Sequence, residues 1–247
     1  RIDVNGSVLN ITLPAEVSDP NKTITDMVIW GTDIWVTAVD LISSTYAMAK
    51  MAIGGSSMSL VVNGSGFFRL CVWNNELYGT WAETGKRHAV LFRVTSVSPF
   101  ASVEVGRVPN AVNSDKGRLF VWNNRLALTR NDGLYVYDGV KLQTVEDLTG
   151  QVDNRNYQFA VALRGYIYYH MPDGMYRTNG SLIEKLYDVS ECGTPVDMVG
   201  GKNRLWFVNV NSLYSGSNRY DRSMRYDFTS SNEVDGRLMC YDGKGLF

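Results

Sequence analysis

The stretch LFVWNNRLALTRNDGLYVYDG, residues 119–139, combines short apolar segments with Asp-Gly pairs at 132–133 and 138–139. Asn and Asp tolerate positive φ and Gly adopts it freely, so Asp-Gly pairs are typical of the tight turns that join antiparallel strands. The segments between the turns are rich in Tyr, Trp, Val, Leu and Phe, which favour strands. The stretch therefore predicts a chain that folds back on itself at short intervals.

The same turn signals recur along the whole chain. They are Asp-Gly at 132–133, 138–139, 173–174, 235–236 and 242–243, and Asn-Gly at 5–6, 63–64 and 179–180. Residues 26–42 are apolar and long enough for a helix, but Gly31 interrupts them and β-branched residues are abundant. These features favour two strands about a turn at 31–33. The sequence as a whole predicts an all-β protein.

Parts of the opening stretch are repeated elsewhere in the chain. Residues 70–80 (LCVWNNELYGT) match residues 119–129, and residues 170–182 match residues 129–142 with their turn pairs aligned. Repeat units are predicted to begin near residues 24, 60, 110, 155 and 196, with a partial unit from about residue 230. An all-strand repeat of this length is typical of one blade of a β-propeller, in which stacked sheets bury faces that each would expose alone. We therefore predict a β-propeller of five or six four-stranded blades that forms a single domain, residues 1–247.

The N-terminal residues differ from the repeats. Residues 7–17 alternate apolar and polar side chains before the first repeat, so residues 1–23 are predicted to hold a closing strand and a loop, and residues 24–247 the blades. Pairing of this strand with the incomplete last repeat would protect an exposed edge. The sequence is compatible both with this pairing and with its absence. Because the chain begins at Arg1 and ends as a new strand begins, we expect a piece of a longer chain.

Composition excludes several classes of partner. The chain has 24 basic and 25 acidic residues and a pI of about 6.2, without the basic patch that nucleic acid requires. No apolar stretch is long enough to predict a membrane span. The three cysteines, Cys71, Cys192 and Cys240, have no metal-type spacing and are predicted to be buried free thiols rather than a disulfide scaffold.

Residues 123–139, NNRLALTRNDGLYVYDG, resemble the repeats of kelch-type propellers, although they lack the paired glycines of a kelch repeat. They are also similar to propeller domains of phage tail and nozzle proteins, in which aromatic strands alternate with YDG-like turns. This resemblance implies a structural or attachment role in a virion, without catalytic residues.

Candidate catalytic residues are few. The two histidines, His88 and His170, lie near no nucleophile motif and are predicted at the rim or surface. Phosphate-binding loops, zinc-protease pairs and nucleophile elbows are absent from the sequence, so no catalytic residue, metal site or cofactor is predicted. A glycosidase would need two converging carboxylates, for which the candidates are Glu76, Glu83, Glu104, Asp132, Asp173, Glu184 and Glu191.

Aromatic residues offer a second kind of site. Strand-centre aromatics are predicted to fill the space between blades; these are Trp73, Trp122, Trp206 and Tyr168. Trp81, in the predicted loop YGTWAETGKR, is the candidate for contact with a ligand such as a sugar ring. Sequons occur at Asn5, Asn10, Asn21, Asn63 and Asn179, and they would be N-glycosylation acceptors in a eukaryotic secretory protein and plain Asn-rich turns otherwise.

These observations lead to three hypotheses of function. The first is a non-enzymatic structural or interaction propeller in a virion or an extracellular assembly, with other protein subunits as partners. The second is a carbohydrate-binding adhesin that takes surface glycans, and the third is a glycosidase.

Overall fold

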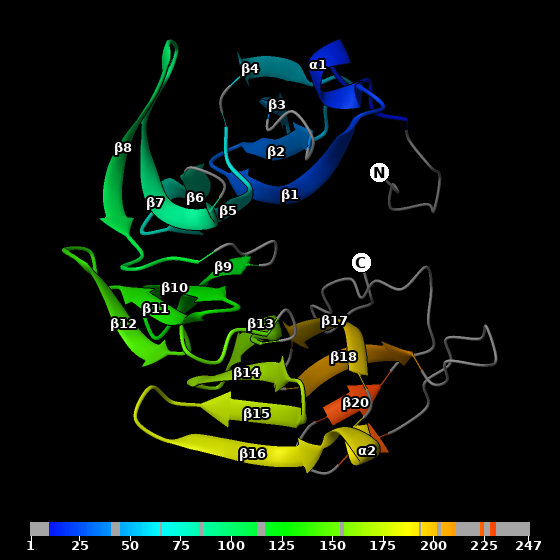
Figure 1. Cartoon of the computed structure of the whole chain (residues 1–247). Coiled ribbons are helices and arrows are strands. Elements are labelled where there is room, and N and C mark those ends of the chain that lie inside the picture. Colours follow the sequence, from blue (N-terminus) through cyan, green and yellow to red (C-terminus); the bar gives the residue numbers. More distant parts are fainter. Residues whose placement is uncertain are drawn as a thin grey trace. The chain divides into compact units, whose positions relative to one another are not determined.

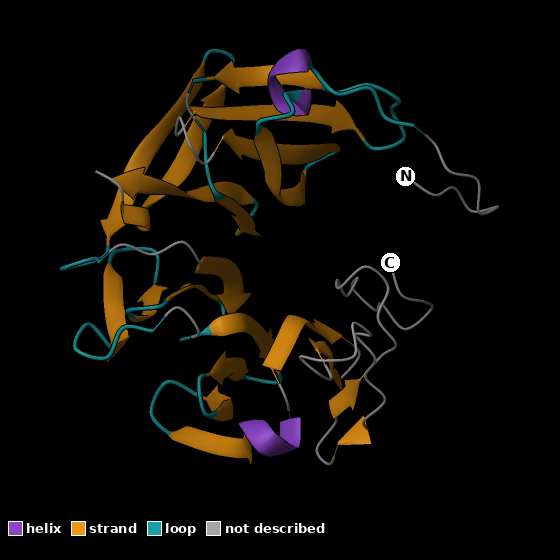
Figure 2. Cartoon of the chain, turned by 45° about the vertical axis from the view of Figure 1, so that its right-hand side comes forward, coloured by secondary structure: helices purple, strands orange, loops and turns teal. Residues whose placement is uncertain are grey.

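A computed structural model describes residues 10–40, 45–64, 66–83, 86–112, 117–153, 156–192, 194–201, 204–210, 223–224 and 228–230. In this part of the chain strands predominate, as Figure 2 shows, and the two helices have four residues each. The prediction of an all-β protein is confirmed. Neither helix is long enough to span a membrane.

The strands form five four-stranded sheets, numbered here in chain order (Figure 1). Sheets 1 to 4 each use four consecutive strands and are antiparallel. Their strands are β1 (Lys22–Trp30), β2 (Asp33–Asp40), β3 (Thr45–Ala52), β4 (Ser59–Asn63), β5 (Arg69–Trp73), β6 (Glu76–Glu83), β7 (Lys86–Val97), β8 (Phe100–Arg107), β9 (Gly117–Trp122), β10 (Arg125–Arg130), β11 (Gly133–Tyr137), β12 (Leu142–Asp147), β13 (Gln158–Leu163), β14 (Tyr166–Met171), β15 (Gly174–Thr178) and β16 (Ile183–Asp188).

Sheet 5 departs from this order. Its strands are β17 (Thr194–Gly201), β18 (Arg204–Val210), β20 (Phe228–Ser230) and β19 (Ser223–Met224), and β18 pairs with β20 in parallel. The helices are α1 (Ala15–Ser18), before sheet 1, and α2 (Val189–Cys192), before sheet 5. The chain divides into two compact units, residues 1–115 with 137–142, and residues 116–136 with 143–247.

Left-handed residues form the turn of the first hairpin in several sheets. Asn74 and Asn75 have φ of 49° and 62°, and Asn123 and Asn124 have φ of 47° and 57°, the geometry of a type I′ turn. In sheet 1 the same place is taken by Gly31, with φ of 61°, followed by Thr32. Residues 26–42 therefore contain two strands about a turn, as predicted.

The turn between the third and fourth strands confirms the alignment of the repeats. Asp138 Oδ1 accepts hydrogen bonds from the N–H groups of Val140 and Lys141, at 2.9 and 3.0 Å. Asn179 Oδ1 accepts from the two corresponding N–H groups in the next sheet, at 3.0 and 2.9 Å. The carboxylate of Asp138 and the amide oxygen of Asn179 thus stabilise equivalent turns in the two sheets.

The turn between the second and third strands differs from the prediction. Met171 pairs with Gly174, so the turn residues are Pro172 and Asp173, and the glycine of the Asp-Gly pair already belongs to β15. Gly174 has φ of 156° and a Cβ there would collide with the carbonyl oxygen of Tyr187. Glycine is required at this position by close backbone packing as well as by turn geometry.

Sheets stack face to face in a constant sense. We call face A the side of a sheet that carries the second residue of its second strand, and face B the opposite side. In the first unit, face B of sheet 1 (Trp35, Met48) packs against face A of sheet 2 (Leu70, Leu77). The same relation recurs in the second unit, described next.

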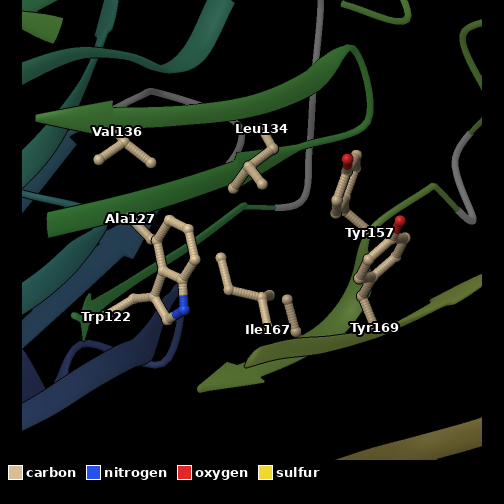
Figure 3. Close-up of a cluster of buried hydrophobic side chains, with 8 residues drawn as sticks. Trp122, Ala127, Leu134, Val136, Tyr157, Ile167 and Tyr169 are labelled. Carbon is tan, nitrogen blue, oxygen red and sulfur yellow. The ribbon is translucent and has the colours of Figure 1, made fainter. Parts of the chain in front are cut away.

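In the second unit, Trp122 on face B of sheet 3 lies in one cluster with Ile167 and Tyr169 on face A of sheet 4 (Figure 3). Tyr168, on face B of sheet 4, clusters with Leu205 on face A of sheet 5. Each sheet thus buries one face against the next. The prediction that Trp73, Trp122 and Tyr168 are core residues is confirmed, since they are 7%, 6% and 7% exposed; the side chain of Trp206 lies outside the described residues.

Two boundary predictions need correction. Sheet 2 begins at Arg69 instead of near residue 60, because residues 59–63 form β4, the last strand of sheet 1. Residues 15–18 form helix α1 instead of the end of a strand, and Thr12 makes only an isolated bridge to Ser57. Residues 1–9 and the partial repeat after residue 230 lie outside the described residues, so the predicted closure and blade count are untested.

The glycine at the start of β15 leads to a stability prediction. We expect Gly174→Ala to lower the free energy of unfolding by about 2 kcal/mol or more, because the new Cβ forces the backbone of β15 away from β16. Gly150→Ala is the matched control, since no atom lies within 4 Å of a Cβ there. Urea unfolding followed by tryptophan fluorescence measures both, and equal midpoints would contradict the prediction.

Candidate interaction surface

In sheets 1 and 3, the tryptophan that ends the first strand forms a hydrogen bond to the following sheet. Trp30 Nε1 donates to the carbonyl oxygen of Asn75 at 2.9 Å, and Trp122 Nε1 donates to that of Gly165 at 2.9 Å. Each acceptor is the second residue of the next sheet's first turn. The ring of Trp122 also lies against Gly180, where a Cβ would be 2.8 Å from Cη2. These indoles join sheets by apolar contact and by a directed hydrogen bond.

Polar groups add to this joint in the first unit. Leu70 N donates to Asp26 Oδ2 at 2.9 Å, and the Thr37 hydroxyl donates to the carbonyl oxygen of Phe67. Both bonds cross from sheet 1 toward the chain that enters sheet 2. Face B of sheet 1 therefore joins sheet 2 by polar as well as apolar contacts.

Face A of sheet 1 has a different cover. Val17 of α1 is 2% exposed and packs with Val36, Ala38, Ala47 and Ala49. Leu13 and Met58 pack against the same cluster, and α1 lies beside sheet 1 in Figure 1. A four-residue helix thus occupies part of a face that other sheets bury against a whole neighbour.

The rest of face A carries exposed apolar side chains. The strand registers place Ile29 opposite Ile34, Met27 opposite Val36 and Ile24 opposite Ala38, so all three point to face A. Leu60 opposes Ala49 on β4, and Ile53 follows β3. The sheet 1 surface, as we name it, consists of Ile24 (45% exposed), Met27 (63%), Ile29 (61%), Ile53 (55%) and Leu60 (38%).

Equivalent positions in other sheets are buried. Counting back from the first turn, Met27 corresponds to Leu70 in β5 and to Ala160 in β13. Leu70 and Ala160 are 2% and 1% exposed. The exposure of Met27 is thus a property of sheet 1 and not of the repeat, which marks this surface as the candidate for a protein contact.

Trp81, the predicted ligand residue, lies elsewhere than expected. It belongs to β6, not to a loop, and its ring centroid is 5.4 Å from that of Tyr46, 6.2 Å from Phe67 and 5.9 Å from Phe92. The side chain is partly buried against the cluster between sheets 1 and 2. The sequence around it suggested a loop because Gly79 and Gly85 flank it, but Gly79 sits in β6 under Phe67.

The placement of both histidines was predicted wrongly, since His88 is 2% and His170 1% exposed. His88 Nδ1 lies 3.0 Å from the Thr80 hydroxyl, and its ring centroid is 4.9 Å from that of Phe68. His170 is the fifth residue of β14, a position that Thr80 occupies in β6. Strand register decides this burial, and the polar neighbours in the sequence do not reveal it.

The acidic candidates are paired with basic side chains where the structure describes them. Asp132 forms a bidentate pair with Arg130 at 2.8 Å, and both side chains are 0% exposed. The other pairs are Glu76–Arg93, Glu104–Arg107, Asp173–Lys185 and Glu184–Arg177. The side chains of Glu83 and Glu191 lie outside the described residues, and within those residues no group of three potential metal ligands was found.

The sequons that can be placed are on the surface. Asn10, Asn21, Asn63 and Asn179 are exposed, and Asn5 lies outside the described residues. Cys71 is a buried free thiol, as predicted, whereas the side chains of Cys192 and Cys240 are not among those described. Glycosylation stays a prediction.

Sequence reasoning missed a buried polar group in the second unit. Tyr157 and Tyr169 stack with centroids 4.4 Å apart (Figure 3), and their hydroxyls, like Glu146 Oε2, are buried without a hydrogen-bond partner among the described residues. Loss of hydration raises the pKa of Glu146, and burial together with the Glu146 charge raises the pKa of Tyr169. No pattern in the sequence marks Glu146, because β12 reads as an ordinary exposed edge strand.

Comparison with known proteins yields limited likeness. No family model and no curated protein matches the chain. A solved structure described as "Structure of YjhT" is similar over 74% of this chain and 69% of its own, with 12% identity and a TM-score of 0.47. A structural-genomics protein of unknown function from Bacteroides thetaiotaomicron VPI-5482 is similar over 81% of this chain and 72% of its own, with 11% identity and a TM-score of 0.34.

The buried carboxyl of Glu146 predicts a pH dependence. Because its folded-state pKa is raised, the folded protein holds this proton more tightly than the unfolded chain, so stability falls as pH rises above the unfolded value of about 4.3. We expect Glu146→Gln to melt at a higher temperature than the wild type at pH 7.5, with the difference lost near pH 3.5. Glu104→Gln controls for the loss of an exposed charge, and a constant difference across pH would contradict the assignment.

Burial of Cys71 predicts that its thiol reacts slowly with alkylating reagents. Loss of hydration raises the pKa of Cys71 to about 12, so little thiolate forms at pH 8. Iodoacetamide should alkylate Cys71 at least about 100-fold more slowly in the folded protein than in urea, read by peptide mass spectrometry. Rapid alkylation under native conditions would show that β5 opens or that Cys71 is accessible.

Proposed function

We propose that the chain is a non-enzymatic interaction module of a larger protein assembly, built from five or six propeller-type blades, and that another subunit, rather than the last blade of the same chain, covers the sheet 1 surface. One observation carries the proposal. Met27 is 63% exposed at a repeat position where Leu70 and Ala160 are 2% and 1% exposed.

The physical cost of the free surface supports this function. Burial of a Met or Ile side chain contributes about 1.5–3 kcal/mol, and single exposed apolar residues need no explanation, but five around one face do. Apolar groups grouped on one sheet face, beside a small helical cover, suit a partner that supplies the missing apolar layer.

The propeller part of the proposal rests on the constant stacking sense. Face B packs on the next face A between sheets 1 and 2 in one unit, and twice in the other unit. Repetition of a single joint is the building rule of propellers. The resemblance of the turn pattern to phage tail and nozzle propellers supports a virion or extracellular assembly as the setting.

The contacts of Trp81 give the carbohydrate-binding alternative no specific support. Its ring packs against Tyr46 and Phe92 and is not part of an open aromatic platform. Each described acidic candidate for a glycosidase has a basic partner, which agrees with a structural role and supports the non-enzymatic proposal.

Site-specific crosslinking tests the proposal. Met27 is replaced by a photoreactive benzoylphenylalanine in the full chain, expressed where the assembly forms, and adducts are mapped by mass spectrometry. We expect position 27 to crosslink to a different polypeptide. Val140, 86% exposed on the β11–β12 turn, is the matched control and should give at most background adducts.

Two results would overturn the proposal. Adducts from position 27 to residues of the same chain would show that the chain covers its own face. Adducts no more frequent than those from position 140 would show that the surface has no occupant.

A further inference from the structure

We propose that Asn63 is a site of spontaneous deamidation, a covalent modification in which the backbone nitrogen of Gly64 attacks the side-chain amide. The inference goes beyond the proposed interaction module and does not depend on it. It rests on the different surroundings of Asn63 and Asn179, two asparagines that precede the same two residues.

The local sequence gives the two sites similar chemistry. Each begins an Asn-Gly-Ser triplet, at 63–65 and 179–181, and a third such triplet, 5–7, lies outside the described residues. Glycine has no Cβ, so it leaves the backbone nitrogen after the asparagine open to the side chain. Asn63 and Asn179 are both exposed. A large difference in reactivity between them would therefore come from the folded structure.

The reaction needs only water as a co-reactant. The Gly64 nitrogen forms a bond to Cγ of Asn63, its proton passes to water, and the side-chain nitrogen leaves as ammonia. Water then cleaves one of the two C–N bonds of the resulting five-membered imide. Cleavage at one bond gives aspartate, and cleavage at the other gives isoaspartate, in which the backbone runs through the former side chain.

The side chain of Asn63 lies next to the attacking nitrogen. Gly64 N donates to Asn63 Oδ1 at 3.0 Å, and Cγ is bonded to that oxygen. The reacting groups are therefore close together before the reaction begins, which favours it. Gly64 also has room to reorient, since no atom lies within 4 Å of a Cβ built there.

One hydrogen bond opposes the attack. Gly64 N also donates to the carbonyl oxygen of Tyr46, at 2.8 Å. This bond lies just beyond the pair formed by Asn63 and Ala47, at the end of the described ladder between β3 and β4, and β4 is the edge strand of sheet 1. Ends of strands open at a low cost in free energy, so this bond gives Gly64 N limited protection.

The amide of Asn179 is directed away from the corresponding nitrogen. Asn179 Oδ1 accepts hydrogen bonds from the N–H groups of Ser181 and Leu182, the second and third residues after it. Two bonds hold the amide in this turn, as the carboxylate of Asp138 is held in the preceding sheet.

Gly180 is restrained as well. Its N–H donates to the Thr178 hydroxyl oxygen at 3.0 Å, and Thr178 is only 2% exposed. The ring of Trp122 lies against Gly180, as described above. Attack on Asn179 would have to break the bond to Thr178 and rotate the Gly180 peptide against this ring, so the folded structure protects Asn179 and not Asn63.

The reaction would change the edge of sheet 1. Aspartate at position 63 adds a negative charge, whereas isoaspartate lengthens the backbone opposite Ala47 and disrupts the regular pairing of β3 with β4. The strand β4 also carries Leu60 of the sheet 1 surface. Deamidation is thus a time-dependent change at the edge of the candidate contact surface, and either product removes the acceptor amide of the sequon.

Peptide mass spectrometry after incubation of the folded full chain at pH 8 tests the inference. Tryptic peptides 51–69 and 178–185 contain one asparagine each, so the two sites are followed separately. We expect Asn63 to deamidate at least about tenfold faster than Asn179, because only Asn63 is placed for the attack. In urea the two sites should react at similar rates, since their triplets are identical.

Two variants examine the cause of the difference. Thr178→Val removes the acceptor for Gly180 N at nearly constant volume, and it should accelerate deamidation of Asn179 and leave Asn63 unchanged. Asn63→Gln is the control for the reaction itself. Its longer side chain would have to close a six-membered ring, so peptide 51–69 should show almost no conversion.

Three results would overturn the inference. Asn63 might react no faster than Asn179 in the folded protein, or the ratio of the two rates might be the same in urea, in which case the sequence alone would explain it. Conversion of peptide 51–69 in Asn63→Gln would show that the mass change arises elsewhere. If Thr178→Val does not fold, the comparison of the two sites in the wild type still decides the question.

Discussion

The structure depends on the contact between face B of one sheet and face A of the next. A four-stranded sheet with apolar residues on both faces is marginal alone, because each face would remain in water. The joint between sheets 1 and 2 shows how this is solved: Trp35 and Met48 fill the space above Leu70 and Leu77, and Trp30 adds a hydrogen bond to the next turn. The indole joins apolar burial to a directional bond, which defines the register of one sheet on the next.

This stacking also explains the polar groups in the interior. The fifth residue of the second strand is Thr37, Thr80, Thr129 and His170 in sheets 1 to 4, and each is buried. Thr37 bonds to the backbone of Phe67, and Thr80 lies within hydrogen-bond distance of His88. The Arg130–Asp132 pair, wholly buried, satisfies two charges at a turn where the sheets leave no water. Stacking thus removes solvent from polar side chains on otherwise ordinary strands.

Sheet 1 shows what happens where the repeat has no preceding member in its unit. Helix α1 brings Val17 onto Ala47 and Ala49, a small cover over small residues. Beyond it the face keeps large exposed apolar side chains. Terminal units of open repeat arrays usually have polar outer faces, and the apolar face of sheet 1 departs from that pattern.

Local sequence features determined the all-β fold class and the positions of many of the turns. Turn residues act through their own φ preferences and through bonds to the next few N–H groups, so Gly31, Asp138 and Asn179 carried their signal without help from the rest of the protein. Burial of strand aromatics such as Trp122 was equally predictable, because large apolar side chains in a repeated pattern of strands pack against one another.

Tertiary structure alone decided which face each strand presents and which sheet covers it. His88 and His170 are buried, Trp81 lies in a strand and Met27 is exposed because of register and stacking partners far away in the sequence. A shift of one residue in register exchanges the two faces of a strand, and no local preference encodes that choice.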